Sequence, residues 1–328
     1  MKKIGLIGLV LLLIVSMSVF AGGGKAAGGG AQAQTVKEIR MATGGVAGTY
    51  YPFGTVIGQV WQEQTKIPVT IQSTGASRAN LQLIEAGEVE IAMVQNDVAD
   101  YAFFGTEQFA SEGKIKGFSA MASLYPEHCQ VVANPGAGIR TIADLRGKRV
   151  SVGDAGSGTE INARQILEIY GISFNDIQRQ NLSFAASAEA IKDGRLDAAF
   201  VVAGAPTSAI VDLALTNNVV VLEVDTANAN RLKEKYPIYA TVNIPANSYR
   251  GQTATVQTVA ILAIFVAADT IPENVIYDLT KALVEQQPKI AAGHAKGNEL
   301  SRQSIVNGIS IPYHPGAAKY LKEIGALK

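Results

Sequence analysis

The segment IEAGEVEIAMV at residues 84–94 returns as IKDGRLDAAFV at residues 191–201. In both copies a helix-like stretch ends at a glycine, Gly87 or Gly194, which suits the left-handed conformation that often follows a helix end. An acidic residue and an apolar run come next, and such a run is typical of a buried strand. One helix–strand unit is therefore used twice, and two related α/β lobes are predicted.

A glycine-rich segment also recurs, at nearly the same offset. GGVAGT at residues 44–49 has its counterpart in GDAGSGT at residues 153–159. Each segment lies between an expected strand and an expected helix, and ligands of open α/β sheets bind at the carboxyl ends of the strands. Two lobes that each offer such a loop predict a ligand held between them.

Residues 1–21 have the layout of a secretory signal peptide, with two lysines before an apolar run from Ile4 to Phe20 and small residues after it. We expect cleavage after Ala21, with Ala33 as the alternative. The run is also close to the minimum length of a spanning helix, so an uncleaved membrane anchor is the competing interpretation. Both interpretations place the rest of the chain outside the cytoplasm, in the periplasm. Residues 22–35 are almost entirely small or polar and are typical of a flexible linker.

The composition excludes several classes of protein. Basic and acidic residues balance at 28 each, and no basic run stands out, so nucleic acid is not an expected partner. The single cysteine, Cys129, forms no internal disulfide and does not follow the apolar run, where lipid attachment would require one. His128, His294 and His314 lack metal-ligand spacing, so no metal site is expected. Dinucleotide-binding, P-loop and Gly-x-Ser-x-Gly patterns are missing, so neither a cofactor nor an enzyme is predicted.

Strands and helices alternate along the chain, which predicts a mostly parallel sheet with helices on both faces. Short strands are expected at 118–124 and 129–133. The long apolar strand at 259–266 has no helix before it, so the chain is expected to cross back to the first lobe. We therefore assign 36–133 and 243–328 to lobe I and 134–242 to lobe II. At least two strands then cross between the lobes and make a hinge.

Five expected strand ends run into polar or glycine-rich turns that open helices, and all five should face one cleft. Glycines let backbone N–H groups approach a ligand, and a helix N-terminus adds unpaired donors and a partial positive charge. Such a cleft can hold a carboxylate without an arginine. The turns lie at residues 43–52, 73–77, 95–97, 153–159 and 203–207.

Helix capping competes with ligand contact at several of these positions. Ser157 and Glu160 match a capping box, in which the serine caps the helix and the glutamate reaches back to its backbone. Hydroxyl residues at helix starts are more often caps than ligand contacts. A ligand role in this loop therefore rests on Thr159 and the flanking glycines.

The same competition applies to Ser73, Thr74 and Ser77, for which contact and capping are equally expected. Arg78 is either a solvated helix residue or a partner for a second acidic group on the ligand. Tyr50 lies beside a glycine-rich loop, where it belongs either to the core or to a cover over the apolar part of a ligand.

Four segments resemble the TAXI family of TRAP transporter solute-binding proteins: MATGGVAGTYYP at 41–52, STGASRANL at 73–81, VQNDVA at 94–99 and LRGKRVSVG at 145–153. The first two are the most specific, and the resemblance extends from about residue 37 to the C-terminus. It implies an α/β, two-lobed type II periplasmic-binding-protein fold with a hinge of crossing strands. It also implies closure on a small carboxylate, such as glutamate, glutamine or 2-oxoglutarate, which is delivered to an ion-gradient-driven membrane permease.

The resemblance also implies where the ligand lies, and Arg78 is added as a candidate because of its place beside the second loop. One departure affects the expected solute, since many relatives have a glycine where this chain has Ala76 and an uncharged residue where it has Arg78. The positions matching the family are Gly44, Gly45, Thr49, Tyr50, Ser73, Thr74, Ser77, Gln95, Ser157, Gly158 and Thr159.

The predicted function is that of an extracytoplasmic solute-binding receptor of a TRAP-type transporter. A sensory module, in which a membrane receptor reads the closed form, is the main alternative. An enzyme on the same frame is least favoured, because it needs a general base in the cleft. Asp97, Asp154 and Glu160 are the nearby acids, and all three are better explained as helix-start residues.

Overall fold

The computed structural model of the chain describes residues 36–328, so the expected signal peptide, membrane anchor and linker lie outside the described residues. No helix within this range has both the length and the apolar character needed to cross a membrane. A ten-stranded sheet runs through the described part of the chain. Its path is β2-β1-β3-β10-β4-β7-β5-β6, with β8 paired to β4 and β9 paired to β10.

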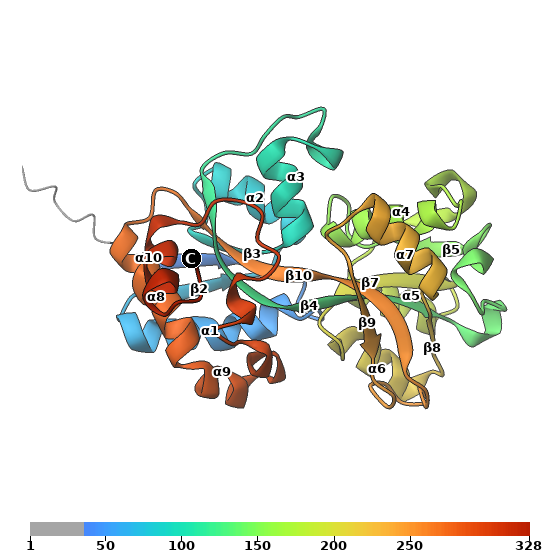
Figure 1. Cartoon of the computed structure of the whole chain (residues 1–328). Coiled ribbons are helices and arrows are strands. Elements are labelled where there is room, and N and C mark those ends of the chain that lie inside the picture. Colours follow the sequence, from blue (N-terminus) through green and yellow to red (C-terminus); the bar gives the residue numbers. More distant parts are fainter. Residues whose placement is uncertain (1–35) are drawn as a thin grey trace, which may run out of the picture. The chain divides into compact units, whose positions relative to one another are not determined.

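Two groups of parallel strands occupy the two ends of this sheet (Figure 1). The lobe I group is β1 (Ile39–Ala42), β2 (Val69–Gln72) and β3 (Ile91–Gln95). The lobe II group is β5 (Arg149–Ser151), β6 (Gln178–Gln180) and β7 (Ala198–Ala203). The two short strands at the sides are β8 (Val220–Leu222) and β9 (Ala240–Ile244).

Two long strands connect the groups. β4 (Phe118–Ala133) and β10 (Val256–Ala268) pair with each other in antiparallel orientation, and β10 pairs with β3 while β4 pairs with β7. These ladders are also antiparallel, so the sheet is mixed and the prediction of a mostly parallel sheet was wrong. The reason is that both crossing strands lie within the sheet itself and run against their neighbours.

The two short strands expected at 118–124 and 129–133 are one continuous strand, β4. Proline lacks an N–H and is excluded from strands that are paired on both sides. Pro126 is tolerated because it pairs only with Leu262 of β10, while the ladder to β7 begins at His128. β4 thus passes from one lobe to the other at the point where one of its edges is free.

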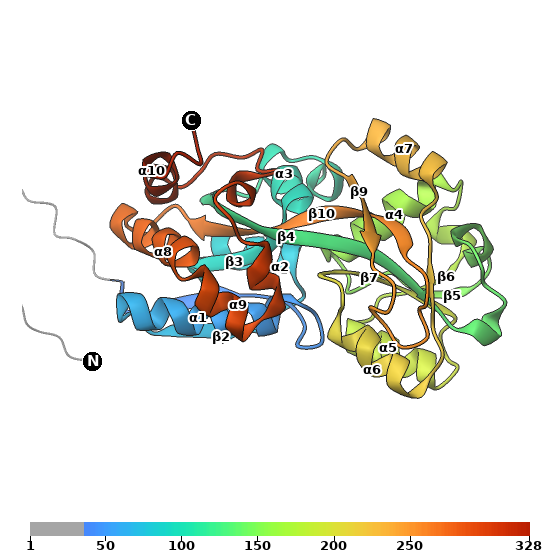
Figure 2. The same ribbon diagram turned by 60° about the horizontal axis from the view of Figure 1, so that its bottom comes forward.

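Helices pack on both faces of the sheet in each lobe, as the sequence predicted (Figure 2). On β1 and β3, Met41 and Met93 enter one core, while the alternate residues Ala42 and Val94 enter the other. Lobe I contains α1 (Tyr50–Thr65), α2 (Ser77–Glu85), α3 (Asn96–Phe104), α8 (Glu273–Glu285), α9 (Gln287–Gly293) and α10 (Pro315–Glu323). Lobe II contains α4 (Gly158–Ile169), α5 (Phe184–Lys192), α6 (Ser208–Thr216) and α7 (Thr226–Lys235).

The repeated segment folds in the same way in both lobes. Gly87 and Gly194 follow α2 and α5 with φ angles of 71° and 69°. The acidic residue before each strand then binds an arginine of the neighbouring strand through both its backbone N–H and its guanidinium. Glu90 binds Arg40 at 2.7 and 2.6 Å, and Asp197 binds Arg149 at 2.8 and 2.6 Å. Each ion pair fixes the start of a strand whose other end opens into a glycine-rich loop.

Candidate functional site

One cavity lies where the helix-start loops of the two lobes meet, and it contains about 500 Å³ of empty space, including the part open to solvent. Lobe I contributes Gly44, Gly45, Gly48, Thr49, Tyr50, Ala76, Ser77, Gln95 and Glu127. Lobe II contributes Asp154, Ser157, Gly158, Thr159, Phe184, Val202 and Ala203.

Most of the residues predicted to contact a ligand line this cavity. They come from the starts of α1, α2 and α4 and from the end of β3, which the fold brings together because the carboxyl ends of the strands in both lobes face the same space. They are Gly44, Gly45, Thr49, Tyr50, Ser77, Gln95, Ser157, Gly158 and Thr159.

Ser73, Thr74 and Arg78 do not line the cavity, because their polar atoms bind the protein itself. The Ser73 hydroxyl donates to the Gly44 carbonyl at 3.0 Å, and the Thr74 hydroxyl donates to the Thr43 carbonyl at 2.8 Å. Arg78 forms an ion pair with Glu112, and its guanidinium lies over an aromatic ring of lobe I. These side chains hold the loop before α2 in place, which is a role that the sequence pattern did not separate from ligand contact.

At the start of α4, Ser157 is the N-cap, as the capping interpretation predicted, but Glu160 accepts from the residue before Ser157 and does not complete the predicted capping box. The Ser157 hydroxyl accepts from the Glu160 N–H at 3.2 Å, and the Glu160 carboxylate accepts from the Gly156 N–H at 2.7 Å. Ser157 is therefore an N-cap that also lines the cavity. The first N–H groups of a helix have no acceptor within it, and Gly158 and Thr159 place such groups at the cavity wall.

The two lobes contact each other around the cavity. The Thr49 hydroxyl donates to the Gly204 carbonyl at 3.2 Å, and the Ala209 N–H donates to the Ala47 carbonyl at 3.1 Å. Gly158 also lies against Gln95 of lobe I, so closely that a Cβ at this position would come within 1.7 Å of the Gln95 Oε1 atom. The structure is therefore a closed form of the two lobes.

The sequence analysis missed Glu127, a carboxyl group in the cavity wall. This residue is 2% exposed, and its carboxylate accepts from the Tyr50 hydroxyl at 3.2 Å. Burial raises the pKa of Glu127 to about 8, although hydrogen bonds from Gln95 and Tyr50 oppose the shift. The available signal was the one acidic residue of β4, a strand in which most residues are apolar.

Gln95 is the second unusual polar group of the wall. Its side chain is 3% exposed, and its Oε1 atom is buried without a hydrogen-bond partner. An unpaired buried acceptor costs about 1–3 kcal/mol. Such an atom in a cavity wall is suited to a ligand that donates a hydrogen bond.

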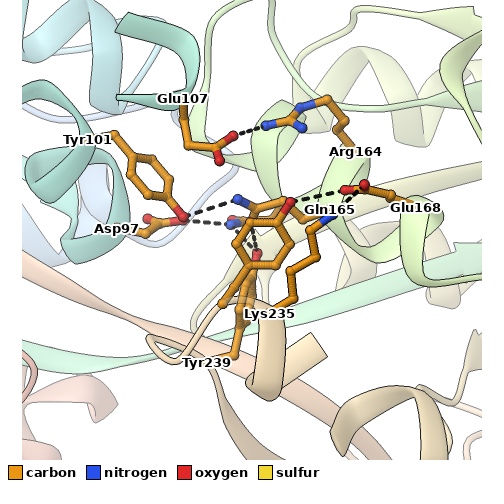
Figure 3. A network of polar contacts seen from close by, with 10 residues as sticks. Asp97, Tyr101, Glu107, Arg164, Gln165, Glu168, Lys235 and Tyr239 are labelled. Carbon is orange, nitrogen blue, oxygen red and sulfur yellow. Dashed lines mark hydrogen bonds and ion pairs between the residues drawn. The ribbon is translucent and has the colours of Figure 1, made fainter. Parts of the chain in front are cut away.

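A buried polar network joins the lobes beside the cavity (Figure 3). The Asn162 amide of α4 donates to the Asp97 carboxylate of α3 and to the Tyr239 hydroxyl, both at 2.7 Å. Tyr239 donates to Gln165 at 2.6 Å, and Gln165 donates to the Tyr101 hydroxyl at 3.1 Å. We call these five residues the interlobe network. Burial raises the pKa of Asp97 to about 6, against the effect of its hydrogen bond from Asn162.

An ion pair between Glu107 of lobe I and Arg164 of lobe II lies next to this network, as Figure 3 shows. Asp97 therefore connects the two lobes through its hydrogen bond and does not line the cavity. Glu160 binds a backbone N–H at the start of its own helix. Among residues 36–328 no group of three or more His, Cys, Asp or Glu side chains is arranged to hold a metal ion.

A family model described as the NMT1-like family matches residues 41–325. The chain also resembles solved structures over most of its length. PhnD1 from Prochlorococcus marinus (MIT 9301) in complex with methylphosphonate is 11% identical, with 80% of this chain and 91% of that chain covered and a TM-score of 0.54. A protein from Bordetella bronchiseptica RB50 is 18% identical, with coverages of 89% and 90% and a TM-score of 0.54.

The alkanesulfonate-binding protein SsuA from Xanthomonas axonopodis pv. citri bound to MOPS is 14% identical, with coverages of 88% and 91% and a TM-score of 0.50. At these identities the likeness establishes the fold alone. The mixed α/β, two-lobed type II periplasmic-binding-protein fold expected from the sequence is confirmed.

Proposed function

The chain belongs to the NMT1-like family, and from this premise we propose that it is the extracytoplasmic solute-binding receptor of a TRAP-type transporter. It captures a small carboxylate between its lobes in the periplasm and delivers it to integral-membrane permease subunits. The observation that carries the proposal is the cavity at which the N-terminal ends of α1, α2 and α4 converge from both lobes.

The wall of this cavity favours a carboxylate held by backbone donors. Gly44, Gly45 and Gly158 bring the main chain to the cavity surface without side chains in between. Helix N-termini bind anions because their first N–H groups are unpaired and their dipoles are positive at that end. None of the described residues that line the cavity is a lysine or an arginine, so a carboxylate there would be held by these N–H groups together with hydroxyls such as those of Ser77 and Thr159.

Closure supplies the signal that a permease can recognise. The contacts of Thr49 with Gly204 and of Asp97 with Asn162 join the two lobes, so they form only when the lobes approach. A ligand that touches both walls binds the closed form more tightly and shifts the population toward it. The TRAP assignment itself rests on the four sequence segments that resemble the TAXI family.

The first test is a thermal-shift and calorimetric screen of the protein purified after secretory expression of the full chain. We expect glutamate, glutamine or a related small carboxylate to raise the Tm, because a ligand that binds only the native state stabilises it. Neutral sugars should have no effect. A shift with sugars alone, or no heat with any carboxylate, would contradict the proposed solute class.

The second test concerns the partner. In proteoliposomes that contain the permease subunits, uptake should require the receptor and an ion gradient. Uptake driven by ATP would place the protein with a different class of transporter. Binding without uptake, together with ligand-dependent association with a membrane receptor, would favour the sensory alternative.

A further inference from the structure

We infer that the solute carries an ammonium group beside its carboxylate and that Glu127 receives this ammonium group. The receptor would then select amino acids over oxo acids and simple carboxylic acids. This inference rests on the proposed function and narrows its solute class.

The charges of the cavity wall are the first argument. Two ionisable acids, Glu127 and Asp154, line the cavity, and no basic side chain among the described lining residues accompanies them. A ligand with negative charge alone would meet these two acids without a cation to offset them. An amino acid offers one group of each sign, so its carboxylate fits the helix N-termini and its ammonium group fits the acids.

Hydrogen-bond capacity gives the second argument. An ammonium group has three donors and no acceptor, whereas a carboxylate has acceptors only. The buried Oε1 atom of Gln95 needs a donor and has none in the protein. Gln95 and Glu127 lie together in the wall, because the Gln95 amide contributes a hydrogen bond to Glu127. An ammonium group in the cavity can donate to the Glu127 carboxylate, which a ligand carboxylate cannot do.

The groups around Glu127 do not include a cation that already pairs with its carboxylate. Tyr50 of α1 donates to its carboxylate, while the Tyr125 hydroxyl, 1% exposed, and Asp97 of α3 lie near it. The charged group that approaches from the other side is Lys296, which is already paired with Glu299 at 2.6 Å. No side chain among the described residues therefore forms an ion pair with Glu127 within 4.0 Å.

A measurable proton release follows. With a pKa of about 8, Glu127 is mostly protonated at pH 7 in the empty closed site. An ammonium group beside the carboxyl group favours its ionised form, so binding of an amino acid at pH 7 should expel a proton into the solvent. A ligand that placed a carboxylate there would keep the Glu127 proton in place or take up a further proton.

The experiment compares ligands that differ only in the amine. Titration calorimetry at pH 7, in phosphate and in Tris, is carried out with L-glutamate against glutarate and with L-alanine against propionate. We expect the amine-bearing member of at least one pair to bind about tenfold or more tightly, which is about 1.4 kcal/mol. Its binding should release close to one proton, read from the dependence of the heat on the buffer.

Variants then assign the effect to Glu127. Glu127→Gln keeps the shape of the side chain and should lose both the preference for the amine and the proton release. Glu273→Gln removes an equal charge from the surface of α8, outside the cavity, and should keep both. If the Glu127 variant does not fold, the preference of the unmodified protein for the amine-bearing ligand of each pair still decides the question.

The outcomes separate the two proposals. No binding of any carboxylate would contradict the proposed function. Binding of glutarate or propionate as tightly as the matching amino acid, or an unchanged preference for the amine in Glu127→Gln, would overturn this inference and leave the carboxylate receptor in place.

Discussion

Ala76 has an unusual backbone conformation for a residue with a side chain. Its φ angle is 67° and its ψ angle is −148°, close to a region that glycine populates and other residues avoid. It is the residue just before α2 and lies in the wall of the cavity. Many members of the TAXI family, which the sequence resembles, have a glycine at this position.

We therefore predict that Ala76→Gly stabilises the protein by about 1 kcal/mol, because the strain of a side chain in this region is removed. For a chain of this size the Tm should rise by about 2–4 °C. Thermal unfolding followed by circular dichroism measures the effect. Ala79→Gly, inside α2, is the control and should lower the Tm, since glycine weakens a helix interior. If both variants lower the Tm equally, the backbone of Ala76 is not strained in the native protein.

At the scale of residues, the sequence predicted the loops of the site but not all of its side chains. The loops and their glycines were identified because strand ends followed by helix starts have a recognisable pattern. Glu127 was missed because it reaches the cavity from the middle of a crossing strand, and nothing in the local pattern tells which face of β4 meets the ligand. The ion pair of Arg78 could not be predicted, because its partner Glu112 is distant in sequence.

At the scale of elements, the start of α4 decides how closely the lobes approach. A Cβ at position 158 would lie 1.7 Å from the Gln95 Oε1 atom and 2.3 Å from its side-chain carbonyl carbon, so the closed arrangement has no room for it. Gln95 belongs to lobe I and α4 to lobe II, and this clash exists only in the closed form.

We predict that Gly158→Ala shifts the protein toward the open form and weakens solute binding by about tenfold or more, or about 1.4 kcal/mol. The Tm without ligand should change much less, because alanine is a better helix former than glycine. Titration calorimetry and small-angle X-ray scattering measure the two effects. Gly75→Ala is the matched control, since Gly75 does not line the cavity and a Cβ there makes only an ordinary contact, 3.7 Å from the Ala79 Cβ. Equal loss of affinity in both variants would show that closure is not the cause.

Elements with regular patterns were predicted well, and elements that depend on distant partners were not. The turn expected at 43–52 opens α1 (Tyr50–Thr65), and the apolar run expected as a strand in the repeat at 84–94 is β3 (Ile91–Gln95). The break expected in β4 does not occur, because the partner of Pro126 is a residue of β10 far along the chain. Local sequence contains no information about which edge of a strand is free.

At the scale of the whole molecule, the repeat at 84–94 and 191–201 predicted two similar units but not the orientation of the strands between them. The acids that start β3 and β7 bind arginines in the same way, so the units are alike in their contacts as well as in sequence. The antiparallel ladders arise from the path of β4 and β10 between the units, which only the complete topology defines.

The interlobe network makes closure dependent on pH. Asp97 is fully buried at this interface, its pKa is raised to about 6, and its partner Asn162 belongs to the other lobe. An aspartate exposed by opening would have an ordinary pKa of about 3.9. The closed form therefore binds the Asp97 proton more tightly than the open form does. The extra stability that this proton gives the closed form is fully present below about pH 4 and is lost as the pH rises through about 6.

We predict that the closed fraction of the ligand-free protein falls as the pH rises from 5 to 7, with a change of about tenfold in the open–closed equilibrium constant. Energy transfer between dyes on the two lobes measures this fraction. Asp97→Asn should remove the transition near pH 6 and leave any transition of Glu127 near pH 8. Asp100→Asn, on the same helix but bonded to Ser310 at 2.5 Å within lobe I, is the control and should keep both transitions. A closed fraction that rises with pH would contradict the assignment, because it would require Asp97 to be more easily ionised in the closed form than in the open one.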